Sequence, residues 1–330
     1  MIPLADALAW LAERTPRLPG ERIPLADAAG RVLAAEVAAA WRGRTAAIDG
    51  QAVRAAETEG ASDYAPLPVG GAPVVAGAAL PAATDAVLPL AALDVGPVAR
   101  AAVARGHGVV QAEAVTLPAG LALRPPHLAL LAQASDVEVV RQPVVSLRVA
   151  GAKAGPEALA AMLRALVAAA GGVVAETAGP DLLIHAGRSG PGTDDDGAAA
   201  FDALFAHGVL IRPGETAALG SIAGRPALLL PGAPLACATA FALLAAPALR
   251  RMAGLPEPAP VAATLARKLA SGLGQIDAVR VRLADGVATP LGPAEGGSLA
   301  AGAGADGLVL VPAGSEGYPG GATVWVHPLP

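Results

Sequence analysis

Residues 144–252 alternate short apolar runs with helical patterns, and this alternation limits the fold more than any other feature of the sequence. VVSLRV at 144–149 predicts a strand. A helix is expected from Pro156 to just before Gly171, since Pro in the first turn and Gly after the last turn are common helix limits. The remaining predicted elements are strands in DLLIHA (181–186), GVLIRP (208–213) and PALLLPG (226–232), a helix burying Phe201, Leu204 and Phe205, and a helix over 236–252. This order indicates a three-layer α/β domain with a mainly parallel sheet, which binds ligands at the carboxyl ends of its strands.

The segments on either side of this region have other patterns. Leu4, Leu8 and Leu11 have helical spacing, and a second short apolar repeat, at 23–33, predicts another local helix. From Trp41 to about residue 120, short Val and Leu runs between Gly, Pro and Asp predict a β-rich unit, and a helical stretch follows over 121–134. The tail, with alternating AVRVRL and ATVWVHPL and an apolar LVLV, predicts a small β-barrel or sandwich. The predicted domains are 1–143, 144–256 and 257–330.

Composition excludes several classes of protein. A net charge of −5 without a basic run argues against docking on nucleic acid, and a lone cysteine, Cys237, excludes an internal disulfide framework. The first 18 residues lack the basic start of a signal peptide, so a cytoplasmic protein is expected. Residues 226–249 carry no charge and are long enough to span a bilayer, but their prolines favour a strand, a turn and a buried helix. No membrane association is therefore expected.

Two loops of the α/β region are the best candidates for chemistry. GRSGPGTDDDG (187–197) follows a predicted strand and precedes a predicted helix, where backbone N–H groups and Ser189 would favour an anion. Asp194, Asp195 and Asp196 are either ligands for a divalent cation beside that anion or a solvated acidic loop that caps the next helix. The second loop, in LLLPGAPLACA, joins a predicted strand to a predicted helix, and its Pro231 and Gly232 would let a ligand approach the backbone closely. GAGADG (302–307) matches G-x-G-x-x-G, but a predicted strand follows it where a dinucleotide-binding loop needs a helix, so it is interpreted as a turn.

Several blocks in the same order resemble one family over nearly the whole chain. IDGQAVRAAETEGAS (48–62) is similar to M-D-G-Y-A-V-R-A-x-D-T-x-G-A-S, and VVAGAALPAATDAVLP (74–89) to I-M-T-G-A-x-L-P-x-G-A-D-A-V-V. IRPGETAALGSIAGRPALLLPGAP (211–234) is similar to M-K-P-G-K-P-x-x-F-G-x-x-x-G-x-P-V-F-x-L-P-G-N-P. These blocks resemble the molybdopterin molybdenumtransferases, the family of MoeA and the gephyrin E domain.

The resemblance implies an elongated homodimer with a helical and β-rich N-terminal region, an α/β molybdopterin-binding domain and a small C-terminal β-barrel. It implies a reaction that converts adenylylated molybdopterin and molybdate to molybdenum cofactor, with Mg²⁺-dependent loss of AMP. Asp49 matches the acid of M-D-G that is important for activity. The positions that match the pterin-phosphate site, with Asp195 as the metal-binding candidate, are Gly187, Ser189, Gly190, Asp195, Arg212, Pro231 and Gly232.

The chain departs from the family pattern at several of these loops. Ala152 and Lys153 stand where two acids are expected, Arg212 and Glu215 replace two lysines, Ala76 replaces a Thr, and Ala233 replaces an Asn. Loss of acids removes cation ligands, and Glu215 would repel an anion. Whether the chain is an enzyme therefore stays open. The alternative is a catalytically impaired relative that acts as a molybdopterin-binding carrier, chaperone or scaffold for a molybdoenzyme.

Overall fold

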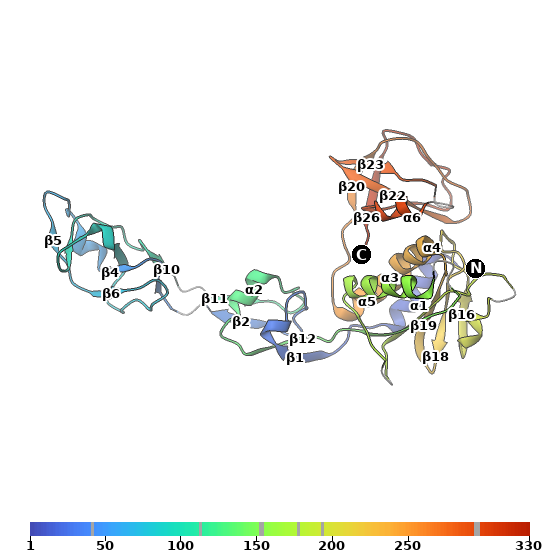
Figure 1. The fold of residues 1–330 in the computed structure, drawn as a ribbon, viewed down its shortest axis with the longest axis horizontal. Coiled ribbons are helices and arrows are strands. Elements are labelled where there is room, and N and C mark those ends of the chain that lie inside the picture. The colour runs from blue at the N-terminus through green and yellow to red at the C-terminus, as the bar shows by residue number, and fades with distance from the viewer. Residues whose placement is uncertain (41–42, 112–113, 152–154, 177–178, 193–194, 294–297) are drawn as a thin grey trace. The chain divides into compact units, whose positions relative to one another are not determined.

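The computed structural model describes residues 1–330 except 41–42, 112–113, 152–154, 177–178, 193–194 and 294–297 (Figure 1). The chain forms two compact units. The first unit contains Met1–Glu21 and Glu138–Pro330, and the second unit contains Arg22–Val137. The predicted division put residues 1–143 in one region. In the structure, the first 21 residues instead pack with the α/β part of the chain.

A six-stranded sheet organises the α/β part of the first unit. Its order is β14 (Val173–Val174), β13 (Val144–Val149), β15 (Leu182–Ala186), β19 (Arg225–Leu230), β18 (Ala218–Ile222) and β16 (Ala203–His207). The first four strands are parallel, whereas β18 and β16 run antiparallel to their neighbours. The predicted strands at 144–149 and 181–186 and the mainly parallel sheet are confirmed.

Helices pack against one face of this sheet. They are α1 (Leu4–Arg14), α3 (Pro156–Ala169) and a continuous helix made of α4 (Pro234–Ala240), the π-helical segment η5 (Phe241–Ala245) and α5 (Ala246–Ala253). Their apolar side chains share one core with strand residues such as Leu182, Ile184 and Leu228, all of which are fully buried. The helices predicted at the N-terminus, from Pro156 and over 236–252 are confirmed.

The opposite face of the sheet differs from the prediction. The helix predicted to bury Phe201, Leu204 and Phe205 is wrong: this region is a short 3₁₀ turn, η4 (Gly197–Ala200), followed by strand β16. Gly197 lies so close to buried Leu229 that a Cβ would come within 3.0 Å of it. The η4 segment thus packs on Leu229 at this face, where a third layer of helix was expected. The predicted strand at 208–213 is reduced to β17 (Ile211–Arg212).

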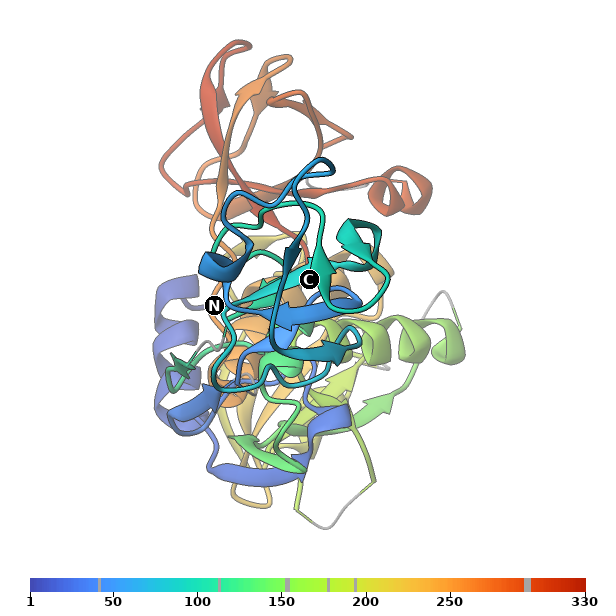
Figure 2. The same cartoon turned by 90° about the vertical axis from the view of Figure 1, so that its left-hand side faces the viewer.

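The C-terminal domain of the first unit is a closed five-stranded barrel (Figure 2, orange and red). The sheet runs β22 (Ile276–Ala284), β23 (Val287–Pro290), β20 (Val261–Leu265), β26 (Thr323–Pro328) and β24 (Gly307–Val311), and β24 pairs back with β22. Closure satisfies the backbone groups that an open sheet would leave at its edges. The predicted small barrel is confirmed, and GAGADG (302–307) joins the short helix α6 (Leu299–Ala303) to β24. The minor strands β21 (Leu269–Ala270) and β25 (Gly317–Tyr318) pair beside the barrel.

The barrel is joined to the α/β part by backbone and side-chain contacts. Strand β17 leaves the α/β region and pairs in parallel with β22 of the barrel. Arg212, at the end of β17, makes a bidentate ion pair with Asp277, with N–O distances of 2.6 and 2.7 Å. Arg280 of β22 donates to the backbone oxygen of Leu235 and to the hydroxyl of Thr239 on α4. The barrel is therefore attached beside the loop that follows β17.

The second unit is built from short strands and turns, as predicted for residues 41–120. At the limit between the two units, β1 (Gly20–Pro24) pairs with β12 (Asp136–Val140). Within the second unit the pairs are β2 (Val37–Ala40) with β11 (Ala114–Leu117), β3 (Thr45–Ala46) with β10 (Val109–Val110), β4 (Gly50–Val53) with β6 (Ala72–Val74) and β7 (Ala86–Pro89), and β9 (Val98–Ala99) with β5 (Leu67–Pro68) and β8 (Leu93–Asp94). The local helix predicted over 23–33 is wrong, because β1 and a 3₁₀ turn, η1 (Leu25–Asp27), occupy it. The helix predicted over 121–134 is shorter, α2 (Pro125–Leu130).

One helical stretch, Pro234–Ala253, is long and apolar enough to cross a membrane by length and composition alone. Its most apolar window is 56% buried inside the first unit. The core helix of a soluble protein has these same properties. The buried side chains of Phe241, Leu244 and Leu249 form part of the core against the sheet.

Candidate functional site

A pocket of about 310 Å³ opens at the carboxyl ends of β13, β15 and β19. Each of these strands runs directly into a loop of the pocket wall, which is where parallel sheets bind their ligands. The loop between β17 and β18 completes the wall, and α4 begins directly after the loop that follows β19. The wall residues are Gly151, Arg188, Ser189, Gly190, Pro191, Asp195, Gly214, Glu215, Thr216, Pro231, Gly232, Ala233 and Ala236.

Backbone packing below the pocket requires glycine at the first position of the predicted anion loop. Gly187 has a φ of +93° and donates its N–H to the oxygen of Leu230 at 2.9 Å. A Cβ on Gly187 would lie 1.7 Å from the oxygen of Ala150. The ends of the three strands can approach one another only because this side chain is absent. Gly187 therefore shapes the pocket floor without being part of its wall.

Ser189 connects two loops of the wall. The residue is 4% exposed, its hydroxyl lies 2.8 Å from the hydroxyl of Thr216, and its backbone oxygen lies 2.9 Å from Nε2 of His207. The contact with Thr216 holds the loop after β15 against the loop that precedes β18, and the contact with His207 holds it against the end of β16. Ser189 thus positions the loop after β15 in the pocket wall.

Arg188 brings a cation to the pocket wall. It adopts a φ of +54°, and its Nε lies 3.1 Å from Asp196 in a solvent-exposed ion pair. Its aliphatic carbons pass over Gly151, where a Cβ would come within 2.7 Å of Arg188 Cγ. A guanidinium can pair with a phosphate through two parallel hydrogen bonds. Arg188 is therefore the wall residue best suited to an anion.

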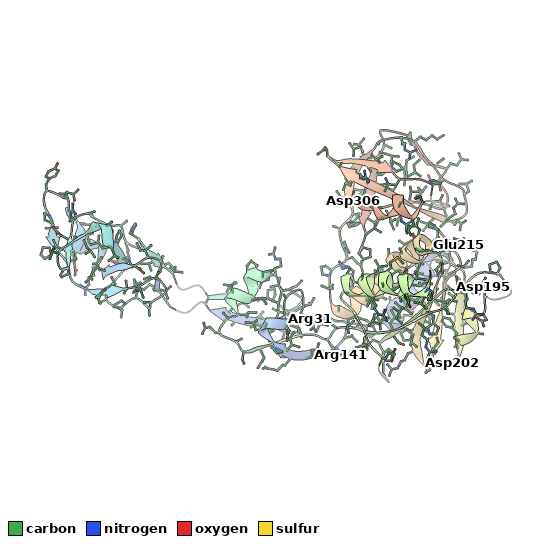
Figure 3. All side chains as sticks on the ribbon, viewed as in Figure 1. Arg31, Arg141, Asp195, Asp202, Glu215 and Asp306 are labelled. Atoms are coloured by element: carbon green, nitrogen blue, oxygen red, sulfur yellow. The ribbon has the colours of Figure 1, made fainter. Side chains whose placement is uncertain are left out.

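Two carboxylates share the same wall (Figure 3). Asp195 accepts the N–H of Gly192 at 2.8 Å, and Glu215 accepts the N–H of Gly214 at 2.9 Å. Because Arg188 is opposed by Asp195 and Glu215, the wall residues carry a formal charge of −1. Among the described residues, no group of three or more His, Cys, Asp or Glu side chains could hold a metal ion.

The structure places Arg212 away from the pocket wall. Its side chain pairs with Asp277 and is 20% exposed, while that of Asp277 is only 4% exposed. Burial alone would raise the pKa of Asp277, but hydrogen bonds from Arg212 and Ser271 hold it below its ordinary value. The guanidinium of Arg212 is thus used to attach the barrel.

Asp49 belongs to the second unit. It is exposed at the start of β4, and its Oδ1 accepts the N–H of Ala76 at 2.7 Å. The N–H of Gly77 donates to the oxygen of Ala46, so two of the sequence blocks lie side by side. The structure therefore brings Asp49 together with Ala76, and it brings the loop residues of the α/β domain together in the pocket.

Some predicted positions lie outside the described residues, namely Ala152, Lys153 and Asp194. Of the pterin-site candidates, Ser189, Gly190, Asp195, Pro231 and Gly232 lie on the pocket wall. Sequence reasoning missed Arg188 and Thr216. Arg188 could have been found, since it stands inside the glycine-rich loop. Thr216 is 27 residues away from Ser189, so no local pattern could reveal their contact.

The fold and the pocket define an α/β protein with a polar pocket at the ends of parallel strands, extended by a C-terminal barrel. The sequence model for the MoeA N-terminal region (domains I and II) matches residues 2–135, and that for the MoeA C-terminal region (domain IV) matches residues 262–329. The chain belongs to the MoeA family.

Individual relatives agree with this assignment. A molybdopterin molybdenumtransferase 2 of Mycobacterium tuberculosis is 28% identical over 307 residues, covering 72% of this chain and 76% of that protein. A Methanocaldococcus jannaschii protein, named for molybdopterin biosynthesis, is 35% identical over 126 residues, which is 30% of its length and 38% of this chain. The crystal structure of a molybdopterin biosynthesis MoeA protein from Pyrococcus horikoshii has a TM-score of 0.73 at 24% identity and covers 99% of each chain. The predicted MoeA-like fold is confirmed.

Proposed function

We propose that this chain acts in molybdenum cofactor biosynthesis and that the strand-end pocket binds molybdopterin through its phosphate. The observation that carries the proposal is the pocket itself, in which Arg188, Ser189 and the glycine-rich backbone meet at the ends of β13, β15 and β19. The membership of the MoeA family supports the ligand, since the relatives named above are molybdopterin proteins. We expect a cytoplasmic homodimer that delivers its product to a molybdoenzyme.

The proposed reaction is the insertion of molybdate into adenylylated molybdopterin with release of AMP. Arg188 would pair with the phosphate, while Gly190 and Gly232 would let the ligand approach the backbone closely. Mg²⁺ usually takes one or two protein carboxylates and completes its coordination with phosphate oxygens and water. Asp195 fits such a role, because its carboxylate lies on the pocket wall. When bound, the ion would neutralise phosphate charge.

The pocket also supports the alternative of a carrier, chaperone or scaffold. Glu215 stands on the wall where the family pattern has a lysine, and Arg212 is held by Asp277. Both features lower the positive charge available to molybdate and to phosphate. Binding without chemistry would follow from such a pocket.

Titration of the purified full chain separates these functions. Molybdopterin and its adenylylated form are added with Mg²⁺ and molybdate, and both binding and AMP release are measured. Binding with AMP release supports the transferase, and binding without release supports the carrier. No binding of either form contradicts molybdopterin recognition.

Two variants sharpen the result. Arg188→Gln should weaken binding of molybdopterin about tenfold or more, because a charge-assisted hydrogen bond is lost. Arg251→Gln, which removes the same charge from a residue outside the pocket wall, serves as its control. Asp49→Asn should abolish AMP release by a transferase, and unchanged release would contradict the catalytic role of Asp49.

A further inference from the structure

A second cavity, of about 250 Å³, lies in the first unit and shares no wall residue with the strand-end pocket. Four elements line it: α1, the continuous helix formed by η5 and α5, and strands β24 and β26 of the barrel. The cavity is therefore a consequence of how the barrel meets the helical layer. It does not depend on the molybdopterin chemistry proposed above.

Most of the cavity wall is apolar. Leu4 and Leu8 lie one turn apart on α1. Leu308 and Leu310 are two positions apart on β24 and so lie on the same face of that strand. Leu243 adds the helix side of the wall. Such a wall favours the apolar body of a small ligand.

Arg250 brings a guanidinium to this wall. Nε of Arg250, on α5, is shielded from solvent and has no hydrogen-bond partner among the described residues. Because Nε is closed to solvent, a ligand in the cavity would pair with the terminal nitrogens of the guanidinium and not with Nε. A carboxylate would satisfy the planar guanidinium through two parallel hydrogen bonds. The chemistry of Arg250 therefore selects an anionic ligand group.

The other titratable wall residues do not replace that ligand group. Glu257 is exposed, and no ion pair joins it to Arg250 among the described residues. His327 pairs in register with Leu308, and burial lowers the pKa of its imidazole, which favours the neutral form. Arg250 is thus the cation of the wall, and no ion pair among the described residues neutralises it.

We propose that this cavity binds a small monocarboxylate with an aliphatic or aromatic body. Its carboxylate pairs with Arg250, and its apolar part lies between α1 and the outer face of β24. The volume is below the roughly 300–1,000 Å³ of pockets for drug-sized ligands, so the ligand is small. Octanoate has the required chemistry and serves as the probe.

Calorimetric titration of the full chain with octanoate tests the proposal. The wild-type protein should bind octanoate saturably and should not bind octylammonium, which has the opposite charge. Arg250→Gln should weaken octanoate binding about ten- to hundredfold, the loss expected for a hydrogen bond to a charged group. Arg251→Gln removes the same charge one residue along the helix and off the cavity wall, so its affinity should stay within about twofold of wild type.

A second variant tests the location of the apolar part. Leu8→Trp fills the cavity from α1 and should abolish octanoate binding, with circular dichroism confirming that the variant is folded. Equal binding by wild type and Arg250→Gln would overturn the proposal. The absence of saturable binding by the wild type at millimolar octanoate would overturn it as well, whatever the result with molybdopterin.

Discussion

Gly187 shows how a single missing side chain sets the geometry of the strand-end pocket. Gly187→Ala would place a Cβ 1.7 Å from the oxygen of Ala150 while keeping a φ of +93°. We expect a loss of about 2 kcal/mol or more in the free energy of unfolding, together with weaker molybdopterin binding. Urea unfolding and a binding titration measure the two effects.

Gly224 offers a matched control for this substitution. It also has a positive φ, +71°, but a Cβ there would meet no atom within 4 Å. Gly224→Ala should therefore cost only about 1 kcal/mol and leave binding unchanged. Similar losses in the two variants would show that the close approach at Gly187 is unimportant.

The ion pair of Arg212 and Asp277 predicts a dependence of stability on pH. The pKa of Asp277 is lower in the folded chain than its ordinary value of 3.8, so the stabilisation is complete above that value and is lost as the pH falls through the folded pKa. Asp277→Asn should lower the free energy of unfolding by on the order of 3 kcal/mol at about pH 7. The difference between wild type and variant should shrink below about pH 4 in urea titrations.

The exposed pair of Arg22 and Asp136 is the control for that prediction. Its side chains are 72% and 44% exposed, against 20% and 4% for Arg212 and Asp277. Asp136→Asn should change the free energy of unfolding by less than about 1 kcal/mol. A pH-independent cost of Asp277→Asn would contradict the role assigned to its ionisation.

Individual site residues could be predicted from the sequence where their role depends on the backbone. Gly190, Pro231 and Gly232 belong to strand-to-loop junctions, and such junctions are visible in the order of residues. The role of Arg212 could not be predicted, because its partner Asp277 is 65 residues further along the chain. The same sequence pattern is compatible with an arginine in the pocket and with one in an ion pair.

At the scale of elements, the sequence predicts the helices and strands whose ends are marked by nearby residues. It does not predict those whose conformation depends on partners far along the chain. Strand β13 and helix α3 have apolar periodicity and Pro and Gly limits of their own. Strand β16 was predicted as a helix, but Phe205 stacks on Trp10 of α1 with ring centroids 5.3 Å apart. This contact and the pairing with β18 decide its conformation, and neither is encoded within the segment.

The loop between β17 and β18 carries Glu215, one of the two carboxylates of the pocket wall. Glu215→Lys replaces a wall carboxylate with the lysine of the family pattern and changes the formal wall charge from −1 to +1. We expect molybdopterin to bind about tenfold more tightly, because a charged donor now faces its phosphate. Titration of the variant measures this directly.

Glu316→Lys makes the same change of charge at an exposed position of the barrel, outside the pocket wall. It should leave the affinity unchanged, because an exposed charge at a distance is screened by salt. If both variants bind molybdopterin as the wild type does, the phosphate does not lie beside Glu215.

At the scale of the whole molecule, the second unit is an insertion within the first. The N–H of Arg141 donates to the oxygen of Pro19, so the chain leaves and returns at one place. A protein in which residues 22–137 are replaced by a short Gly-Ser linker should fold, because the core of the first unit contains no residue of the insertion. Circular dichroism and a cooperative thermal transition would check this.

Deletion of residues 1–21 is the complementary change. It removes Ala7 and Leu11, which are at most 1% exposed in the core of the first unit, together with Trp10. Loss of one such large side chain costs about 2–5 kcal/mol, so this truncation should unfold the unit. A truncated chain as stable as the full chain would contradict the placement of α1 in that core.

Strand β17 has a consequence for the order in which the protein matures. The segment is made well before its pairing partner β22, because the ribosome adds residue 211 before residue 276. While the chain is growing, the loop with Gly214, Glu215 and Thr216 is attached to a strand that still lacks its neighbour. We expect the strand-end pocket to become competent only after the barrel has closed, so a nascent chain would not capture its ligand early.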